Sequence, residues 1–159
     1  MSKRQLVLDN SVISAFAASG WFHDISFWTP QYELYTTDRI WSHEFSPHHS
    51  VSKPEWLHVE TVDTSKLAMR TVKLGEADWT LIRLAEILEG SILVSNDKRL
   101  LEEVERRAIE GIWGSKFLKQ TFESCGIDTQ AYDDGLQSYI HDVHLPTVVV
   151  EELRTAEKK

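Results

Sequence analysis

The 159-residue sequence contains a single cysteine, Cys125, and it has no uninterrupted apolar stretch near the length that crosses a membrane, about 20 residues. One cysteine cannot form a disulfide within the chain. The sequence also lacks an N-terminal apolar run, internal repeats and low-complexity segments. We therefore expect a cytoplasmic protein that needs no disulfide and no membrane. With 42% apolar residues at this length, we expect one domain over residues 1–159 with its own core.

Basic residues are scarce, with 17 Lys and Arg against 25 Asp and Glu and a formal net charge of −8. This balance excludes a protein that binds nucleic acid through a general coat of positive charge. It does not exclude an enzyme that acts on nucleic acid, because carboxylates gathered in one cleft can bind divalent cations that let phosphate approach. The positions of the acids therefore carry the functional argument.

Short apolar runs alternate with helical patterns along the chain. Strands are predicted at residues 5–8, 33–36, 56–62, 91–95 and 112–113. Helices are predicted at residues 12–19, 38–45, 65–72, 76–89, 98–108, 115–125 and 129–143. Residues 21–30 indicate a loop or a broken helix, and residues 147–150 fit either a last helix or a last strand. The alternation predicts a three-layer α/β/α domain with a mainly parallel central sheet, in which ligands bind beyond the carboxyl ends of the strands.

Four acidic residues stand where this fold places its ligands. Asp9 and Asp97 are each the first acid after an apolar strand, so they should meet at one edge of the sheet. Glu44 lies on the helix after the second strand, and Asp78 lies in the first turn of the helix that begins after Gly75. Crowded carboxylates repel one another unless cations separate them, and sites with only oxygen ligands suit Mg²⁺ or Mn²⁺ rather than zinc.

The segments that contain these acids resemble the four acidic blocks of the PIN-domain ribonucleases, which include the toxins of prokaryotic toxin–antitoxin pairs. In this chain the blocks are LVLDNSVI (residues 6–13), IWSHE (40–44), LGEADWTLIRLA (74–85) and ILVSND (92–97). GIWGS (111–115) also resembles the short strand and turn that follow the last block. The resemblance covers about residues 4–124 and leaves residues 127–159 as a C-terminal helical extension.

The resemblance implies a PIN-like fold and a Mg²⁺- or Mn²⁺-dependent endoribonuclease. Asp9, Glu44, Asp78 and Asp97 would be the catalytic, metal-binding acids. Metal ions, about 3.5–4 Å apart where there are two, supply the hydroxide and the charge stabilisation that hydrolysis of an RNA phosphodiester needs. We expect supporting roles for Asn10, Ser11, Glu76, Ser95, Asn96 and Ser115. Glu76 is a rival of Asp78, and Asn96 shares the polar role with Asp97.

The expected partners follow from the same comparison. RNA is the predicted substrate, and an antitoxin protein is the predicted partner if the chain is a toxin. We also expect a homodimer, because related proteins commonly form dimers and because large aromatic residues crowd the early part of the chain, including residues 21–28. No organic cofactor is predicted.

Three other interpretations stay open at this point. The first is a PIN-like module that has lost catalysis and only binds RNA or protein; the presence of all four acids favours the enzyme. The second is a signalling receiver domain with Asp9 in its acidic pocket, for which Asp63 and Lys116 are poorly placed. The third is a zinc site built from His43, His48, His49 and His58 or from His141 and His144, but no partner cysteine or two-histidine helix motif accompanies them. The bases after Asp97 alternate with glutamates, which is typical of a solvated helix face.

Overall fold

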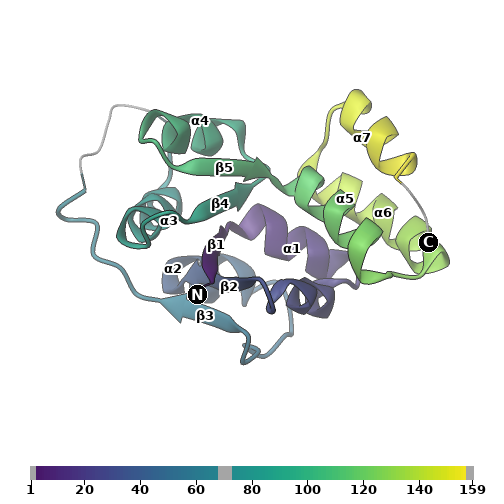
Figure 1. Cartoon of the computed structure of the whole chain (residues 1–159), viewed down its shortest axis with the longest axis horizontal. Coiled ribbons are helices and arrows are strands. Elements are labelled where there is room, and N and C mark those ends of the chain that lie inside the picture. The colour runs from purple at the N-terminus through teal and green to yellow at the C-terminus, as the bar shows by residue number, and fades with distance from the viewer. Residues whose placement is uncertain (1–2, 68–72, 157–159) are drawn as a thin grey trace.

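The computed structural model describes residues 3–67 and 73–156, which form a central parallel sheet with helices on both faces (Figure 1). The five strands of this sheet are β1 (Arg4–Leu8), β2 (Tyr32–Thr37), β3 (Leu57–Glu60), β4 (Ile92–Ser95) and β5 (Glu110–Trp113). All neighbouring strands pair in parallel. The predicted three-layer α/β/α fold class is confirmed, and each predicted strand is present.

The strand order is β3-β2-β1-β4-β5, so the chain moves outward from β1 to β3 and then returns to place β4 on the other side of β1. β1 and β4 are paired through Leu6 with Ile92 and Leu8 with Val94. Right-handed crossovers put α1 (Asn10–Ala18) on one face of the sheet and α3 (Glu76–Ile87) and α4 (Lys98–Arg106) on the other. The crevice at the carboxyl ends of β1 and β4, where the order reverses, is where such sheets form ligand sites.

The remaining helical segments are the 3₁₀ helix η1 (Phe22–Trp28), the short α2 (Asp38–Ile40), the π-helical turn η2 (Trp41–Phe45), α5 (Gly114–Cys125), α6 (Thr129–Val143) and α7 (Thr147–Arg154). Residues 21–30, for which the sequence indicated a loop or a broken helix, contain the helix η1. The strand alternative at residues 147–150 is wrong, because the segment forms a helix that buries Leu153. Of the helix predicted at 65–72, residues 65–67 form a turn and 68–72 lie outside the described residues.

Figure 1 shows α5, α6 and α7 grouped at the end of the molecule toward which β5 points. α6 packs on α1, with the ring of Phe16 6.2 Å from that of Tyr139. The Trp21 ring stacks on Tyr132 at 5.5 Å, and both residues are buried. Phe16 and Trp21 therefore pack in this chain's own core, whereas Phe27 is 37% exposed. The number of early aromatics alone no longer argues for a dimer, which stays a prediction.

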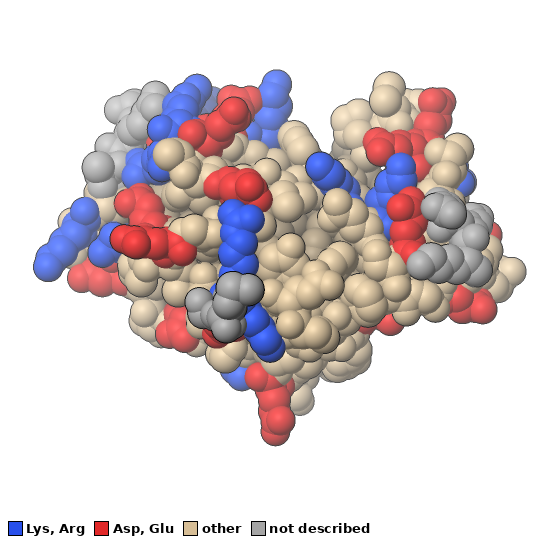
Figure 2. All heavy atoms as spheres, viewed as in Figure 1, with Lys and Arg blue, Asp and Glu red and all other residues tan. Residues whose placement is uncertain are grey.

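Charged side chains of both signs are interspersed over the face drawn in Figure 2, without a continuous basic surface. This agrees with the excess of acids in the sequence. Within the described ranges, no helix is both long enough and apolar enough to cross a membrane.

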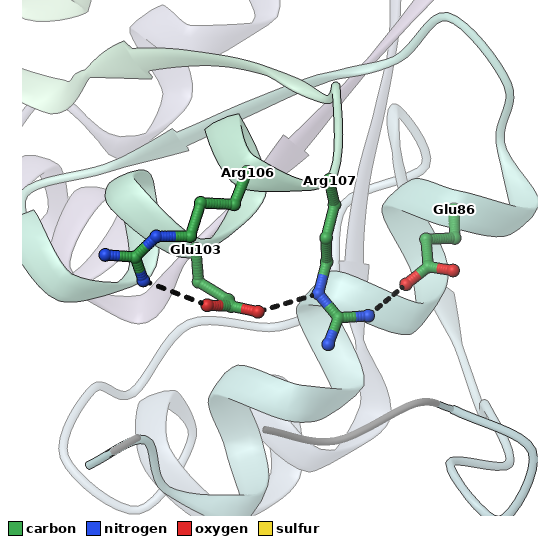
Figure 3. Close-up of polar contacts among 4 residues, drawn as sticks. All are labelled: Glu86, Glu103, Arg106 and Arg107. Atoms are coloured by element: carbon green, nitrogen blue, oxygen red, sulfur yellow. Dashed lines mark hydrogen bonds and ion pairs between the residues drawn. The ribbon is translucent and has the colours of Figure 1, made fainter. Parts of the chain in front are cut away.

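A buried ion-pair network joins α3 to α4 (Figure 3). The carboxylate of Glu103 is 1% exposed and accepts bonds from Arg107 Nε at 2.9 Å and from Arg106 at 3.4 Å. Arg107 also donates to Glu86 on α3 at 2.9 Å, and its guanidinium lies 5.5 Å from the Trp79 ring centre. The sequence predicted a solvated helix face here. Glu103 corrects that prediction, since it shares the inward face of α4 with the apolar side chains.

Candidate active site

Asp9 is the most buried carboxyl group at the crevice between β1 and β4. It directly follows β1, caps the N-terminus of α1, and is 5% exposed. Its Oδ1 accepts a bond from the backbone N–H of Asn10 at 2.7 Å. Its Oδ2 accepts bonds from Ser95 Oγ at 2.6 Å and Ser11 Oγ at 3.0 Å. Burial raises the pKa of Asp9 above its ordinary value, the three hydrogen bonds oppose that rise, and the charge of Asp97 adds to it.

The turns after β1, β4 and β5 are joined by hydrogen bonds among the supporting residues. Ser95 Oγ accepts a bond from the backbone N–H of Asp97 at 2.9 Å. The backbone N–H of Asn96 donates to Ser11 Oγ at 2.9 Å, and its side-chain Nδ2 donates to the Ser11 carbonyl at 3.1 Å. Asn96 Oδ1 accepts a bond from the backbone N–H of Ser115 at 3.1 Å. These bonds hold the three turns in one arrangement around Asp9.

Gly114 allows the third turn to approach this closely. A Cβ atom at this position would stand 2.7 Å from both Asn96 Oδ1 and Asn96 Nδ2, well inside van der Waals contact. On the other side, Asn96 Nδ2 lies 3.4 Å from the hydroxyl of Tyr139, a buried residue of α6. The C-terminal helices thus contact the network that surrounds Asp9. Neither Gly114 nor Tyr139 was identified from the sequence.

Asp78 and Glu44 bring negative charge to Asp9 from two other elements. Asp78 Oδ2 accepts the backbone N–H of Gly75 at 3.1 Å in the first turn of α3. Burial raises the pKa of Asp78 to about 6, with further contributions from the charges of Asp9, Asp97 and Glu44. Burial and the charge of Asp9 also raise the pKa of Glu44 in the π-helical turn, while Arg39 opposes this. Asp78 and Glu44 are therefore near enough to Asp9 for their charges to act on it.

The remaining two acidic candidates, Asp97 and Glu76, have different surroundings. Asp97 caps α4, and its Oδ1 accepts the backbone N–H of Arg99 at 2.9 Å. The backbone N–H of Asp97 nevertheless donates to Ser95 Oγ, and its charge contributes to the raised pKa values of Asp9 and Asp78. Glu76, the rival of Asp78, has a side chain that is 74% exposed and lies 3.7 Å from Arg39 in an ion pair. The structure thus places Asp78, not Glu76, in electrostatic contact with Asp9.

The donor set at this crevice fits a hard divalent cation. Its side chains offer oxygen ligands only. Burial first, and then the charges of neighbouring carboxylates, raise the pKa values of Asp9, Glu44 and Asp78, and a bound cation would offset both effects. Asn10 Oδ1, beside Asp9, is buried and has no hydrogen-bond partner among the described atoms. As the side chains stand, no three histidine, cysteine or acidic residues within 3–67 and 73–156 are close enough to hold a metal ion. Binding would therefore require rotation of the less constrained carboxylates toward Asp9.

The histidines have separate neighbours. His49 Nε2 lies 3.0 Å from Ser14 Oγ, and its ring stacks on Phe45. His58 stacks on Tyr35, and the rings of the pair near the C-terminus are 6.0 Å apart. Burial lowers the pKa of His49, which is the opposite of the effect on the carboxyl groups.

No protein-family model and no curated protein sequence matches this chain. The strand order still separates two of the candidate folds. A receiver-type sheet has the order 2-1-3-4-5, with its third strand beside the first. Here β3 is an edge strand separated from β1 by β2, so Asp63, which follows it, is not adjacent to Asp9 in the sheet. The receiver interpretation is therefore wrong.

Proposed function

We propose that this protein is a Mg²⁺- or Mn²⁺-dependent endoribonuclease of the PIN type, which hydrolyses RNA phosphodiester bonds. The observation that supports the proposal is the position of Asp9 and Asp97 after β1 and β4, where the strand order reverses and Ser95 Oγ is hydrogen-bonded to both residues; the charges of Asp78 and Glu44 also act on Asp9. Acidic residues that are neighbours in sequence lie close together whatever the fold, so repulsion between them would not indicate a function. Four sequence-distant carboxylates that repel one another at a ligand crevice indicate a cation site.

Metal ions held by these acids would supply a hydroxide at neutral pH and would stabilise charge on the phosphoryl oxygens. The protein itself contributes by positioning the carboxylates. Asp9 is fixed by its three hydrogen bonds and is the rigid member of the set. Asp78 has one backbone bond, to Gly75, so its carboxylate is freer to adjust. The N-termini of α1, α4 and α5 follow strands that end at this edge, and their partial positive charge favours a phosphate there.

The deciding experiment compares Asp9→Asn with wild type in the cleavage of single-stranded RNA in Mn²⁺. The loss of one ligand removes several kcal/mol of transition-state stabilisation, so we expect cleavage to fall by about 10³-fold or more. Glu110→Gln is the matched control, because this exposed acid begins β5, at the end of the sheet opposite the carboxyl ends of the strands, and forms an ion pair with Arg4 at 3.6 Å. That variant should cleave like wild type.

Two results would contradict the proposal. Wild-type cleavage that survives in Asp9→Asn would mean that the activity arises elsewhere. Wild-type protein that binds RNA without cutting it in either metal would favour the alternative of a PIN-like binding module. An antitoxin partner and a homodimer extend the proposal and stay predictions, since they are motivated by the sequence resemblance alone.

A further inference from the structure

A pocket of about 340 Å³ lies where the end of β5 and the start of α5 face α7. Trp113, Lys116 and Lys119 line it from β5 and α5, while Pro146 and Val149 line it from the C-terminal extension. Figure 2 shows a notch in this region, between the bulk of the domain and the lobe that contains α7, with basic side chains at its edge. Comparison with Figure 1 places the notch beyond the tip of the β5 arrow.

The pocket opens beside the acidic cluster. Trp113 is the register partner of Ser95 on the neighbouring strand, and the hydroxyl of Ser95 donates to Asp9. Adjacent strands are about 5 Å apart, so β5, two strands from β1, places Trp113 roughly 10 Å from the end of β1 where Asp9 lies. Ser115, which also lines the pocket, donates its backbone N–H to Asn96 within the network around Asp9. A chain bound at the acids would therefore have its neighbouring unit at this pocket.

The lining has the chemistry of a nucleotide site. Trp113 is 43% exposed, which is unusual for so large an aromatic ring, and it offers a flat face for stacking. Lys116 and Lys119 supply positive charge in a chain whose net charge is −8. Lys119 is held at 3.3 Å from Glu152 of α7, whereas no ion pair involving Lys116 is found within the described residues. A planar base on the indole and a phosphate at Lys116 would satisfy both features.

We propose that this pocket binds one nucleotide of the RNA strand next to the scissile phosphate, with its base stacked on Trp113 and a phosphate at Lys116. The proposal rests on the proposed nuclease function and adds a subsite to it. The apolar side chains of Pro146 and Val149 enclose the base from the α7 side, so the C-terminal extension takes part in substrate binding. Because Glu152, which also lines the pocket, pairs with Lys119, it is the charge of Lys116 that favours an anionic nucleotide over an apolar peptide as the occupant.

The test measures cleavage of short single-stranded RNAs that carry an abasic site at each successive position around the cut. Stacking of one base contributes about 1–3 kcal/mol, so one abasic position beside the cut should lower wild-type kcat/KM by about 5- to 150-fold, mainly through KM. Trp113→Ala should lower kcat/KM on intact RNA to a similar degree and should show no further loss on that abasic RNA. Phe27→Ala, which removes another partly exposed aromatic residue, is the matched control and should behave like wild type.

The result separates the subsite from the nuclease itself. The subsite is refuted if wild-type protein cleaves RNA but its kcat/KM is the same for every abasic position, or if Trp113→Ala keeps the wild-type kcat/KM. In either case the nuclease proposal stands, and a protein segment becomes the better occupant of the pocket. If wild-type protein cleaves no RNA, the proposed function fails first. A second measurement uses the inactive Asp9→Asn protein. We expect the indole N–H signal of Trp113 in NMR spectra to shift on addition of short RNA, and an unmoved signal would overturn the proposal.

Discussion

Replacing Asp78 by Asn should stabilise the metal-free protein at pH 7.5. Asp78 is a half-buried carboxylate whose pKa is raised from an ordinary 3.8 to about 6, first by burial and then by the charge of Asp9. Asn has nearly the same shape, and its Oδ1 can still accept the backbone N–H of Gly75 that the carboxylate accepts at 3.1 Å. The substitution therefore removes the charge while keeping the helix cap.

The sign and the size of this effect follow from the two pKa values. Below about pH 4 the Asp78 carboxyl is protonated in the folded and the unfolded chain alike and contributes nothing. Between about pH 4 and 6 the unfolded chain loses its proton first, so the folded state becomes less stable as the pH rises. At about 1.4 kcal/mol for each pH unit, the full penalty above pH 6 is about 3 kcal/mol. Solvent screening and the attraction of the helix N-terminus reduce the expected gain to about 1–2 kcal/mol.

Thermal unfolding in a chelator at pH 4 and at pH 7.5 measures this gain. We expect Asp78→Asn to raise the Tm by about 4 °C at pH 7.5 and by much less at pH 4. Glu76→Gln is the matched control, because this exposed acid occupies the same turn and its removal should give no such gain. Added Mn²⁺ should then stabilise wild type more than Asp78→Asn, by mass action on the native state. A variant less stable than wild type at pH 7.5 without metal would refute the reasoning.

Two further predictions concern packing. Gly135→Ala should destabilise the fold by about 1–3 kcal/mol in urea unfolding, because the new Cβ would lie 2.6 Å from the Trp21 ring and 2.7 Å from the Ser19 carbonyl. Alanine favours helices over glycine, so a gain in stability would contradict that geometry. Glu103→Ala should cost about 3 kcal/mol by the same assay, because it removes a buried partner of Arg107, whereas the exposed Glu105→Ala should change little. Equal losses from the two glutamate variants would show that the buried network contributes nothing specific.

The parts of the site that follow from local sequence were predictable. Asp9 and Asp97 stand directly after apolar strands, and parallel strands end at a common edge, so their meeting required only the fold class. The family resemblance named Asp78 as the metal-binding acid with Glu76 as its rival, and the exposure of Glu76 agrees with the choice of Asp78.

Other features depend on contacts between distant segments, and no local pattern reports them. Glu103 looks like any other glutamate of a charged helix until α3 brings Glu86 to Arg107. The exposure of Trp113 depends on how the C-terminal extension is placed beside β5. Gly114 reads as an ordinary turn residue, yet the approach of Asn96 decides its role.

The packing of α6 has a consequence for where this domain ends. The expected resemblance to the ribonuclease blocks ends near residue 124, which would suggest a domain boundary there. Tyr132 and Tyr139 are fully buried against the helices that follow β1 and β5, and the Tyr132 hydroxyl donates to the Leu153 carbonyl at 2.7 Å. A chain cut at residue 126 would expose Trp21 and Phe16 to water and remove a neighbour of Asn96. The segment with the expected resemblance is therefore shorter than the segment whose side chains share this core, which reaches at least Leu153.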